Sequence, residues 1–115
     1  MLSKKYDEVK KEDVTTEGAK DVSIRWLIGK ESNAPFYLRH FEIKPGGHTP
    51  YHSHPWEHEI YALEGTARIN TQEGAIPLEK GSFALVRSGE AHQFENTGHT
   101  TFTFLCAIPD PEKKK

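Results

Sequence analysis

The sequence lacks several features that identify common classes of protein. It has a single cysteine, Cys106, so no internal disulfide is possible, and there is no CxxC pair of the kind found in zinc ribbons and thiol redox sites. The longest apolar run, near residues 102–108, is far shorter than the roughly 20 residues that cross a bilayer. The N-terminal segment carries lysines without the apolar centre of a signal peptide. We therefore expect a cytoplasmic protein that has no membrane partner.

The chain also lacks an excess of charge of either sign. Fifteen basic and 17 acidic residues give a formal net charge of −2 with neutral histidines. The basic residues form no long stripe, so we expect no nucleic-acid partner. The sequence contains no GxGxxG, P-loop or GxSxG motif, which argues against nucleotide-dependent and serine-hydrolase functions. A small-molecule partner is the remaining expectation.

Helical periodicity is scarce, and apolar and polar residues alternate with a period of two along most of the chain. The predicted strands cover residues 23–28, 36–44, 58–64, 66–71, 83–86, 91–95 and 101–108. Glycine-containing turns separate them. Short strands at this spacing in 115 residues predict a single all-β domain over residues 1–115, folded as a small β-barrel. Residues 1–20 are then an N-terminal arm, and residues 109–115 are a solvated tail.

The first stretch of functional interest covers residues 46–65. Gly46 is followed after five residues by His52. One residue separates His52 from His54, three separate His54 from His58, and six separate His58 from Gly65. Residues i and i+2 of an extended strand point the same way, so His52 and His54 face one side. A short bend then brings His58 towards them, and three imidazoles can converge.

The second stretch covers residues 81–96, where Gly81, Gly89, His92 and Asn96 are separated by seven, two and three residues. His92 would complete a four-histidine site from a separate strand. Neutral imidazole binds zinc, copper, nickel and iron, and three or four such ligands with an open position are typical of catalytic sites. A lone histidine is usually a polar surface residue, but four at these spacings predict one divalent transition metal per chain.

The two stretches resemble the two motifs of the cupin family, G(X)5HXH(X)3–4E(X)6G and G(X)5PXG(X)2H(X)3N. The matching residues are Gly46, His52, His54, Gly65, Gly81, Gly89, His92 and Asn96. Two positions depart from the motifs: His58 stands where the family usually has a glutamate ligand, and Arg87 replaces the proline.

The resemblance implies a double-stranded β-helix of the jelly-roll type. Taken as a whole, the chain is similar to small single-domain manganese cupins with a four-histidine site, which implies a homodimer with one metal per subunit. Manganese is the metal implied, with iron, copper, nickel or zinc as alternatives. Because a neutral imidazole at His58 does not offset the charge of the ion as a carboxylate does, the bound metal would be a stronger Lewis acid.

Strand alternation predicts the other residues of the site. Tyr37, Arg39 and Phe41 share one face of their strand, and Ile60, Phe104 and Cys106 are predicted to face the same interior from other strands. We take Tyr37, Phe41, Ile60 and Phe104 as pocket residues and Arg39 and Cys106 as candidate catalytic residues. Arg39 either holds an anionic or carbonyl-bearing substrate or covers apolar surface with its stem. Cys106 either lies near the metal as an oxidisable group or is a small buried apolar residue.

Three functions fit these residues. The leading interpretation is a metal-dependent oxidoreductase of the dioxygenase kind, acting on a small organic substrate. A metal-dependent isomerase or lyase would need a general base near the metal, and no carboxylate is expected on the inner face. The third is a non-catalytic module that binds a small molecule or a metal.

Overall fold

The structure is a computed structural model of the chain, and it describes residues 1–112. Within these residues the chain forms nine strands and two short 3-10 helices. The helices are η1 (Tyr6–Glu8) and η2 (Lys30–Ser32). The strands are β1 (Glu12–Asp13), β2 (Lys20–Ile28), β3 (Phe36–His48), β4 (His58–Glu64), β5 (Thr66–Thr71), β6 (Gly74–Glu79), β7 (Phe83–Val86), β8 (Gln93–Asn96) and β9 (Phe102–Pro109). This confirms the all-β prediction.

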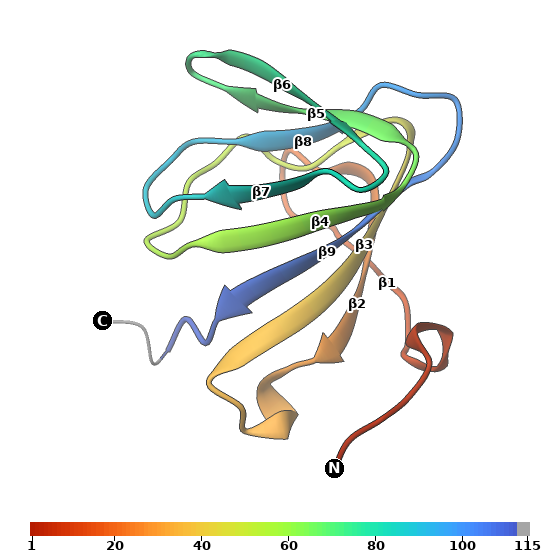
Figure 1. The fold of residues 1–115 in the computed structure, drawn as a ribbon, viewed down its shortest axis with the longest axis vertical. Coiled ribbons are helices and arrows are strands. Elements are labelled where there is room, and N and C mark those ends of the chain that lie inside the picture. The colour runs from red at the N-terminus through yellow and green to blue at the C-terminus, as the bar shows by residue number, and fades with distance from the viewer. Residues whose placement is uncertain (113–115) are drawn as a thin grey trace.

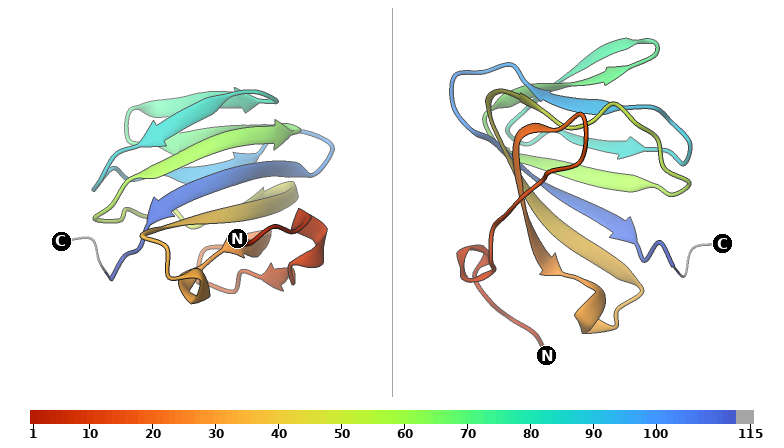
Figure 2. Two further views of the ribbon diagram at one scale, coloured as in Figure 1. Left: turned by 60° about the horizontal axis from the view of Figure 1, so that its bottom comes forward. Right: turned by 180° about the vertical axis from the view of Figure 1, so that it is seen from behind.

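The strands form one antiparallel sheet that folds over on itself into two layers (Figure 1). One layer has the order β2-β3-β9-β4-β7, and the other has the order β6-β5-β8. The long strand β3 belongs to both, because it pairs with β2 and β9 along most of its length and reaches β8 at His48, opposite Glu95. Seen from two further directions, the layers lie face to face with one end open (Figure 2). The result is a small, nearly closed barrel.

Residues 45–47, which follow the predicted end of the strand at residue 44, instead form a bulge inside β3. Val22 of β2 pairs with Ile43, whereas Lys20 pairs with His48, so the register shifts by several residues at this point. Gly46 has a φ of +82°, a conformation that costs glycine little and that other residues rarely adopt. Bulges bend a strand, and this one lies where β3 passes from the first layer to the second.

The core lies between the layers and is aromatic at its centre. Phe102 and Phe104 of β9 are almost fully buried, as is Ile43 of β3. The ring of Phe104 packs against Phe41 at 5.0 Å and against Phe94 at 4.9 Å between centroids. Burying each such side chain contributes roughly 1.5–3 kcal/mol. The alternation predicted for β9 is therefore confirmed, since Phe102, Phe104, Cys106 and Ile108 all face inward.

The two ends of the chain are more ordered than the sequence suggests. The arm lies along the outer edge of the first layer, where Glu12 and Asp13 of β1 pair with β2. At the other end β9 continues to Pro109, and Asp110 is buried with its backbone N–H donating to Pro35 at 3.0 Å. The tail predicted from residue 109 thus begins later, and its last three residues lie outside the described part of the chain. No helix among the described residues is long and apolar enough to cross a membrane.

Candidate metal centre

Backbone pairing brings the two histidine stretches together. His52 donates its backbone N–H to the carbonyl of His92 at 3.1 Å, and His92 donates back to His52 at 2.9 Å, which forms an isolated antiparallel bridge. His58 is the first residue of β4, in register with Val86 of β7. The backbone N–H of Gly89 donates to the carbonyl of His54 at 2.7 Å. Each stretch therefore fixes the position of the other.

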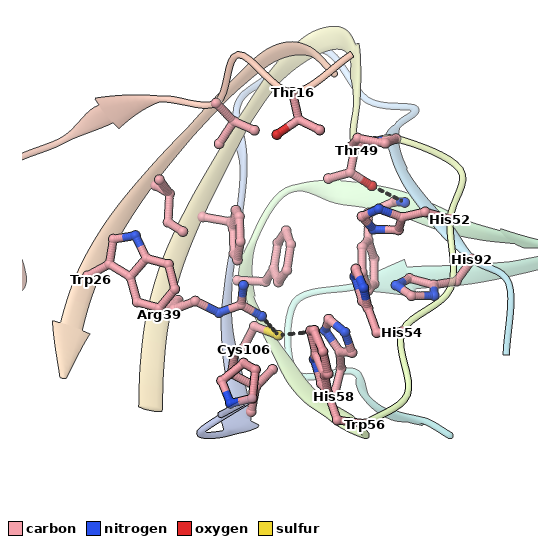
Figure 3. Close-up of a pocket in the computed structure, with 18 of the residues that line it drawn as sticks. Thr16, Trp26, Arg39, Thr49, His52, His54, Trp56, His58, His92 and Cys106 are labelled. Carbon is pink, nitrogen blue, oxygen red and sulfur yellow. Dashed lines mark hydrogen bonds between the residues drawn. The ribbon is translucent and has the colours of Figure 1, made fainter. Parts of the chain in front are cut away.

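The four predicted histidine ligands form one cluster (Figure 3). The rings of His54 and His52 are 4.2 Å apart between centroids, and those of His54 and His58 are 4.9 Å apart. His92 lies 5.2 Å from His52 and 5.1 Å from His58. One nitrogen from each of His52, His54 and His92 lies within 4.8 Å of the others. His58 adjoins this group of three but is not part of it at that distance.

Hydrogen bonds assign the two nitrogens of His92 and of His58 to different roles. His92 has its Nδ1 2.9 Å from the carbonyl oxygen of Glu90, which accepts the ring proton and leaves Nε2 free. His58 has its Nδ1 3.4 Å from the Sγ atom of Cys106, while its Nε2 is buried and has no hydrogen-bond partner among the described residues. A buried polar atom without a partner needs an explanation. The free Nε2 of His58, beside three other imidazoles, fits a metal ligand.

The cluster keeps the imidazoles of His52, His54 and His58 neutral. Burial, with smaller contributions from nearby charges, lowers the pKa of His54 to about 4. Burial and then the positive charge of Arg39 lower the pKa of His58 to about 3. The pKa of His52 is also lowered, chiefly by burial. Neutral imidazole is the form that binds a metal, so these residues are ready to bind one near neutral pH. The donor set and the free nitrogen of His58 fit a transition metal of the kind that imidazole prefers.

The cluster forms one wall of a cavity of about 460 Å³. Two of the four predicted pocket residues, Phe41 and Phe104, line it. Tyr37 and Ile60 face inward as predicted but belong to the core beside the cavity, which corrects their assignment as pocket residues. Strand alternation gives the side of the sheet on which a residue lies, but not its position along the barrel. Tyr37 lies near the end of the barrel that Asp110 closes, where burial and Asp110 raise the pKa of its hydroxyl.

Both candidate catalytic residues line the cavity. Arg39 donates from Nη2 to the Sγ atom of Cys106 at 2.9 Å, and the same sulfur contacts His58 (Figure 3). Arg39 also lies over two aromatic rings, with its Cζ atom 5.5 Å from the centre of Trp26 and 5.0 Å from that of Phe41. Burial raises the pKa of the Cys106 thiol, although Arg39 acts in the opposite direction. The structure thus connects the arginine to a metal-ligand candidate through one sulfur atom.

The sequence analysis missed the contribution of the arm to this cavity. Asp13 and the three residues that follow it line the cavity from the arm, together with Thr49 from the end of β3. Asp13 is the one acidic residue among the described residues that line it. Its sequence neighbours are charged and weakly patterned, so only the tertiary position of the arm reveals it. Asp13 is an exposed residue of the arm and not of the inner face of a barrel strand, so the expectation that no carboxylate lies on that inner face stays a prediction.

Other residues of the two stretches have structural roles. The side-chain amide of Asn96 donates to the carbonyls of Ile43 at 2.8 Å and Thr100 at 2.9 Å, which holds the loop after β8. Gly65 has a φ of +90°, and a Cβ there would lie 2.8 Å from the carbonyl oxygen of Thr101, so the position requires glycine. His48 is the last residue of β3, where it pairs with Glu95 of β8, and its ring contacts the carbonyl of Thr49.

These observations define an all-β barrel domain with a histidine cluster in an internal cavity, brought together by two glycine-bracketed stretches. The chain belongs to the cupin family: the model of the cupin domain matches residues 39–108. The matched region begins at Arg39 and includes all four histidines of the cluster. The resemblance noted in the two motifs is therefore confirmed.

Solved structures and a curated protein are similar to this chain in structure or in sequence. The polyketide cyclase RemF from Streptomyces resistomycificus is 37% identical with a TM-score of 0.89, over 95% of this chain and 79% of that one. A predicted oxalate decarboxylase from Thermotoga maritima is 28% identical with a TM-score of 0.84, over 94% and 98% of the two chains. The tetracenomycin polyketide synthase protein TcmJ from Streptomyces glaucescens is 30% identical over 66% of this chain. The chain spans about half of that protein, 54% of its length.

Proposed function

We propose that this protein is a metal-dependent cyclase that closes a ring in a small aromatic, carbonyl-rich substrate of the polyketide type. The observation that carries the proposal is the histidine cluster on the wall of a cavity whose other walls are mostly apolar and include five aromatic side chains. The similarity to the polyketide cyclase RemF, which extends over nearly the whole chain, supports this substrate class. Such a substrate is planar and apolar with carbonyl oxygens along its edge, which suits a cavity of this composition.

The cluster would hold one metal through His52, His54, His58 and His92. A bound divalent metal would supply Lewis acidity that polarises a substrate carbonyl. Trp56 would keep His54 in place, because the two rings stack in parallel with centroids 4.8 Å apart. We take manganese as the first candidate because of the resemblance to the four-histidine manganese cupins. Iron, copper, nickel and zinc are the alternatives, because neutral imidazole suits all four of these metals.

Asp13 supplies the proton acceptor that ring closure needs. An aldol cyclisation removes a proton from a carbon beside one carbonyl, joins that carbon to a second carbonyl carbon and places a proton on the oxygen of that second carbonyl. Asp13 is one of the residues that line the cavity, and its carboxylate would take the first proton and return it to the oxygen. Cys106 would act indirectly, by accepting the Nδ1 proton of His58 so that Nε2 stays free for the metal.

A metal-dependent oxidoreductase of the dioxygenase kind is the second candidate. The observation that favours it is the donor set, because neutral imidazoles bind redox-active iron and copper as well as zinc. The same cavity would then hold the substrate beside the metal. We further propose that the protein works in the cytoplasm as a homodimer, with the single thiol of Cys106 reduced and buried.

Metal analysis tests the site. Purified wild-type protein should contain about one transition metal per chain, and replacing any one of His52, His54, His58 or His92 by alanine should lower that content clearly. The exposed residue His99 provides the matched control, since His99→Ala removes an imidazole outside the cluster. Full metal content in His58→Ala would reduce the site to three histidines, and full content in all four variants would refute it.

Turnover tests the reaction class. Protein stripped of metal and reloaded with manganese, iron, copper, nickel or zinc would be incubated with an aromatic compound that carries a β-diketone side chain, and the products separated by mass. A cyclised product in the presence of metal, absent with His52→Ala and with Asp13→Asn, supports the cyclase. Oxygen consumption that depends on substrate and metal would instead support the oxidoreductase. A protein that binds the substrate yet gives neither result with any metal would be a binding module.

A further inference from the structure

Buried nitrogen atoms without a partner gather in the cavity. Among the described residues, four buried side-chain nitrogen or oxygen atoms have no hydrogen-bond partner. They belong to Arg39, His40, Trp56 and His58. Three of these residues, all except His40, line the cavity. The free atom of His58 fits a metal, which leaves the Nε–H of Arg39 and the Nε1–H of Trp56 as two donors with no acceptor.

The guanidinium of Arg39 is a cation in an apolar place. It lies over the rings of Trp26 and Phe41, and its one hydrogen bond to the described residues goes to a thiol sulfur, which is a weak acceptor. Arg39 takes part in none of the ion pairs among the described residues, and Asp13 on the same cavity wall is not paired with it. A charge removed from water without a counterion is costly. An arginine kept in this position is therefore matched to an anion that arrives from outside.

We propose that Arg39 is the receptor for an anionic oxygen of an aromatic ligand, either a carboxylate, a phenolate or an enolate. This inference rests on the proposed function for the ring system of the ligand and adds the charge that the ligand must carry. The aromatic rings around Arg39 provide flat surfaces for the ligand, and Arg39 itself, with its Nε–H and second Nη atom, offers charge-assisted hydrogen bonds to the oxygen. The Nε1–H of Trp56 is a further donor for a neutral oxygen of the ligand.

The position of Arg39 also predicts how the ligand is oriented in the cavity. The same sulfur that accepts from Arg39 lies 3.4 Å from the Nδ1 atom of His58, so the arginine and the histidine cluster are separated by a single side chain. A ligand anchored at Arg39 by its anionic oxygen would extend its remaining carbonyl groups along the cavity past the cluster. In the proposed cyclase, Arg39 is thus a specificity-determining residue that selects acidic substrates and sets which carbonyl reaches the metal.

Binding of two matched probes to metal-free protein tests this inference. Isothermal titration in the presence of a chelator would compare 2-naphthoate with 2-naphthamide, which have the same ring and nearly the same shape but differ in charge. The wild type should bind the acid about ten- to a hundredfold more tightly than the amide, as expected for a charge-assisted hydrogen bond in a partly buried site. Arg39→Met should remove the preference and leave the affinity for the amide unchanged within a few-fold. Arg68→Met is the control, because Arg68 is exposed and pairs with Glu95 on β8, away from the cavity.

The outcomes separate this inference from the proposed function. Equal affinities of the wild type for both probes, no binding of the acid, or an unchanged preference in Arg39→Met would each overturn it. Arg39→Gln keeps a polar side chain and tests the same loss of preference if the methionine variant fails to fold, with the melting curve as the check. Because no metal is present, a preference that depends on Arg39 stands even if metal-loaded protein shows no cyclisation. If the protein cyclises its substrate but shows no preference for the acid, the proposed function stands and the inference about Arg39 is overturned.

Discussion

At the scale of single residues, Cys106 holds His58 in the orientation that the proposed metal site needs. His52 and His92 are fixed by reciprocal backbone hydrogen bonds, and His54 by ring stacking and by its carbonyl. The imidazole of His58 instead meets a side chain, since its Nδ1 atom contacts the Cys106 sulfur while Nε2 stays free. Partners of this kind fix the tautomer and the orientation of a ligating histidine. Metal affinity should therefore depend on Cys106, although this residue would not touch the metal.

We therefore expect Cys106→Ala to weaken metal binding by about ten- to a hundredfold, without abolishing it. Cys106→Ser should restore part of the affinity, because a hydroxyl also accepts from His58 and from Arg39. Competition with a chromophoric chelator would measure both affinities, and the melting temperature of the metal-free variants would report on packing alone. Equal affinity in the alanine variant and the wild type would show that the sulfur does not orient His58.

The buried imidazole of His58 also predicts how stability depends on pH. Its pKa is lowered from an ordinary 6.5 to about 3 in the folded protein. Between these two values the unfolded chain binds more protons than the folded one, so the free energy of unfolding of metal-free protein falls as the pH drops from 6.5 towards 3. The slope from His58, which is 5% exposed, is at most about 1.4 kcal/mol per pH unit.

Urea unfolding of metal-free protein at a series of pH values would measure this slope. His58→Gln keeps a polar side chain of similar size without an ionisable group, and it should flatten the dependence between about pH 6.5 and pH 4. His99→Gln, at an exposed position, should leave the dependence as it is in the wild type. A slope unchanged in His58→Gln would mean that other groups, such as His54, dominate.

At the scale of secondary-structure elements, the N-terminal arm is held on the outer face of the sheet by an aromatic contact and by Arg25, in addition to the pairing of β1 with β2. The ring of Tyr6 stacks on the buried ring of His40 at 4.8 Å between centroids, and the Cζ atom of Arg25 lies over the same Tyr6 ring, 5.1 Å from its centre. Arg25 also donates to the carbonyl of Val9 at 3.0 Å and pairs with Glu42 at 2.6 Å. A few residues later the same arm places Asp13 on the cavity wall. The outer contact and the inner wall are thus parts of one segment.

Removing the Tyr6 ring should loosen this arm. We expect Tyr6→Ala to cost about 1 kcal/mol of stability, the value of an aromatic pair and its burial, and to increase the rate of tryptic cleavage after Lys10 and Lys11 several-fold. Tyr51→Ala removes an equally exposed tyrosine from a loop and serves as the control. Cleavage at the wild-type rate in Tyr6→Ala would mean that the pairing of β1 with β2 holds the arm by itself.

The elements also show what a sequence of this kind can and cannot predict. Strands β4, β5 and β7 have the predicted bounds, because each alternates between a buried and an exposed face and is closed by a glycine or polar turn. Strand β6 was not predicted, since it is an edge strand in which only Leu78 is buried and Pro77 interrupts the alternation. Motif spacing predicted the four histidines because local spacing decides which side chains share a face. Asp13 depends on where the arm lies, which no local pattern encodes.

At the scale of the whole molecule, apolar side chains remain exposed on the outer face of the first layer. Phe83 is 80% exposed, Tyr61 is 49% exposed and Leu85 is 43% exposed, and β4 pairs with β7 so that these residues lie next to one another. The arm does not cover them, because it pairs with β2 at the opposite edge of that layer. Both faces of β4 are therefore apolar, and only the inner one is covered within the chain. Contiguous exposed apolar surface of this kind marks an interaction site.

We predict that a second copy of the chain covers this face. Sedimentation or light scattering at micromolar concentration should give the mass of a dimer, and replacing Phe83 or Tyr61 by lysine should raise the dissociation constant by at least about tenfold, since each substitution removes a large apolar contact and places a charge in the interface. Ile76→Lys changes an equally exposed apolar residue on β6, in the other layer, and should leave the dimer intact. A monomeric wild type, or an Ile76→Lys variant that loses the dimer to the same extent, would contradict the prediction that a second copy covers this face. Because β4 begins at His58, a dimer that forms here would also hold one strand of the metal cluster in place, so the lysine variants should bind metal more weakly at concentrations where they are monomeric.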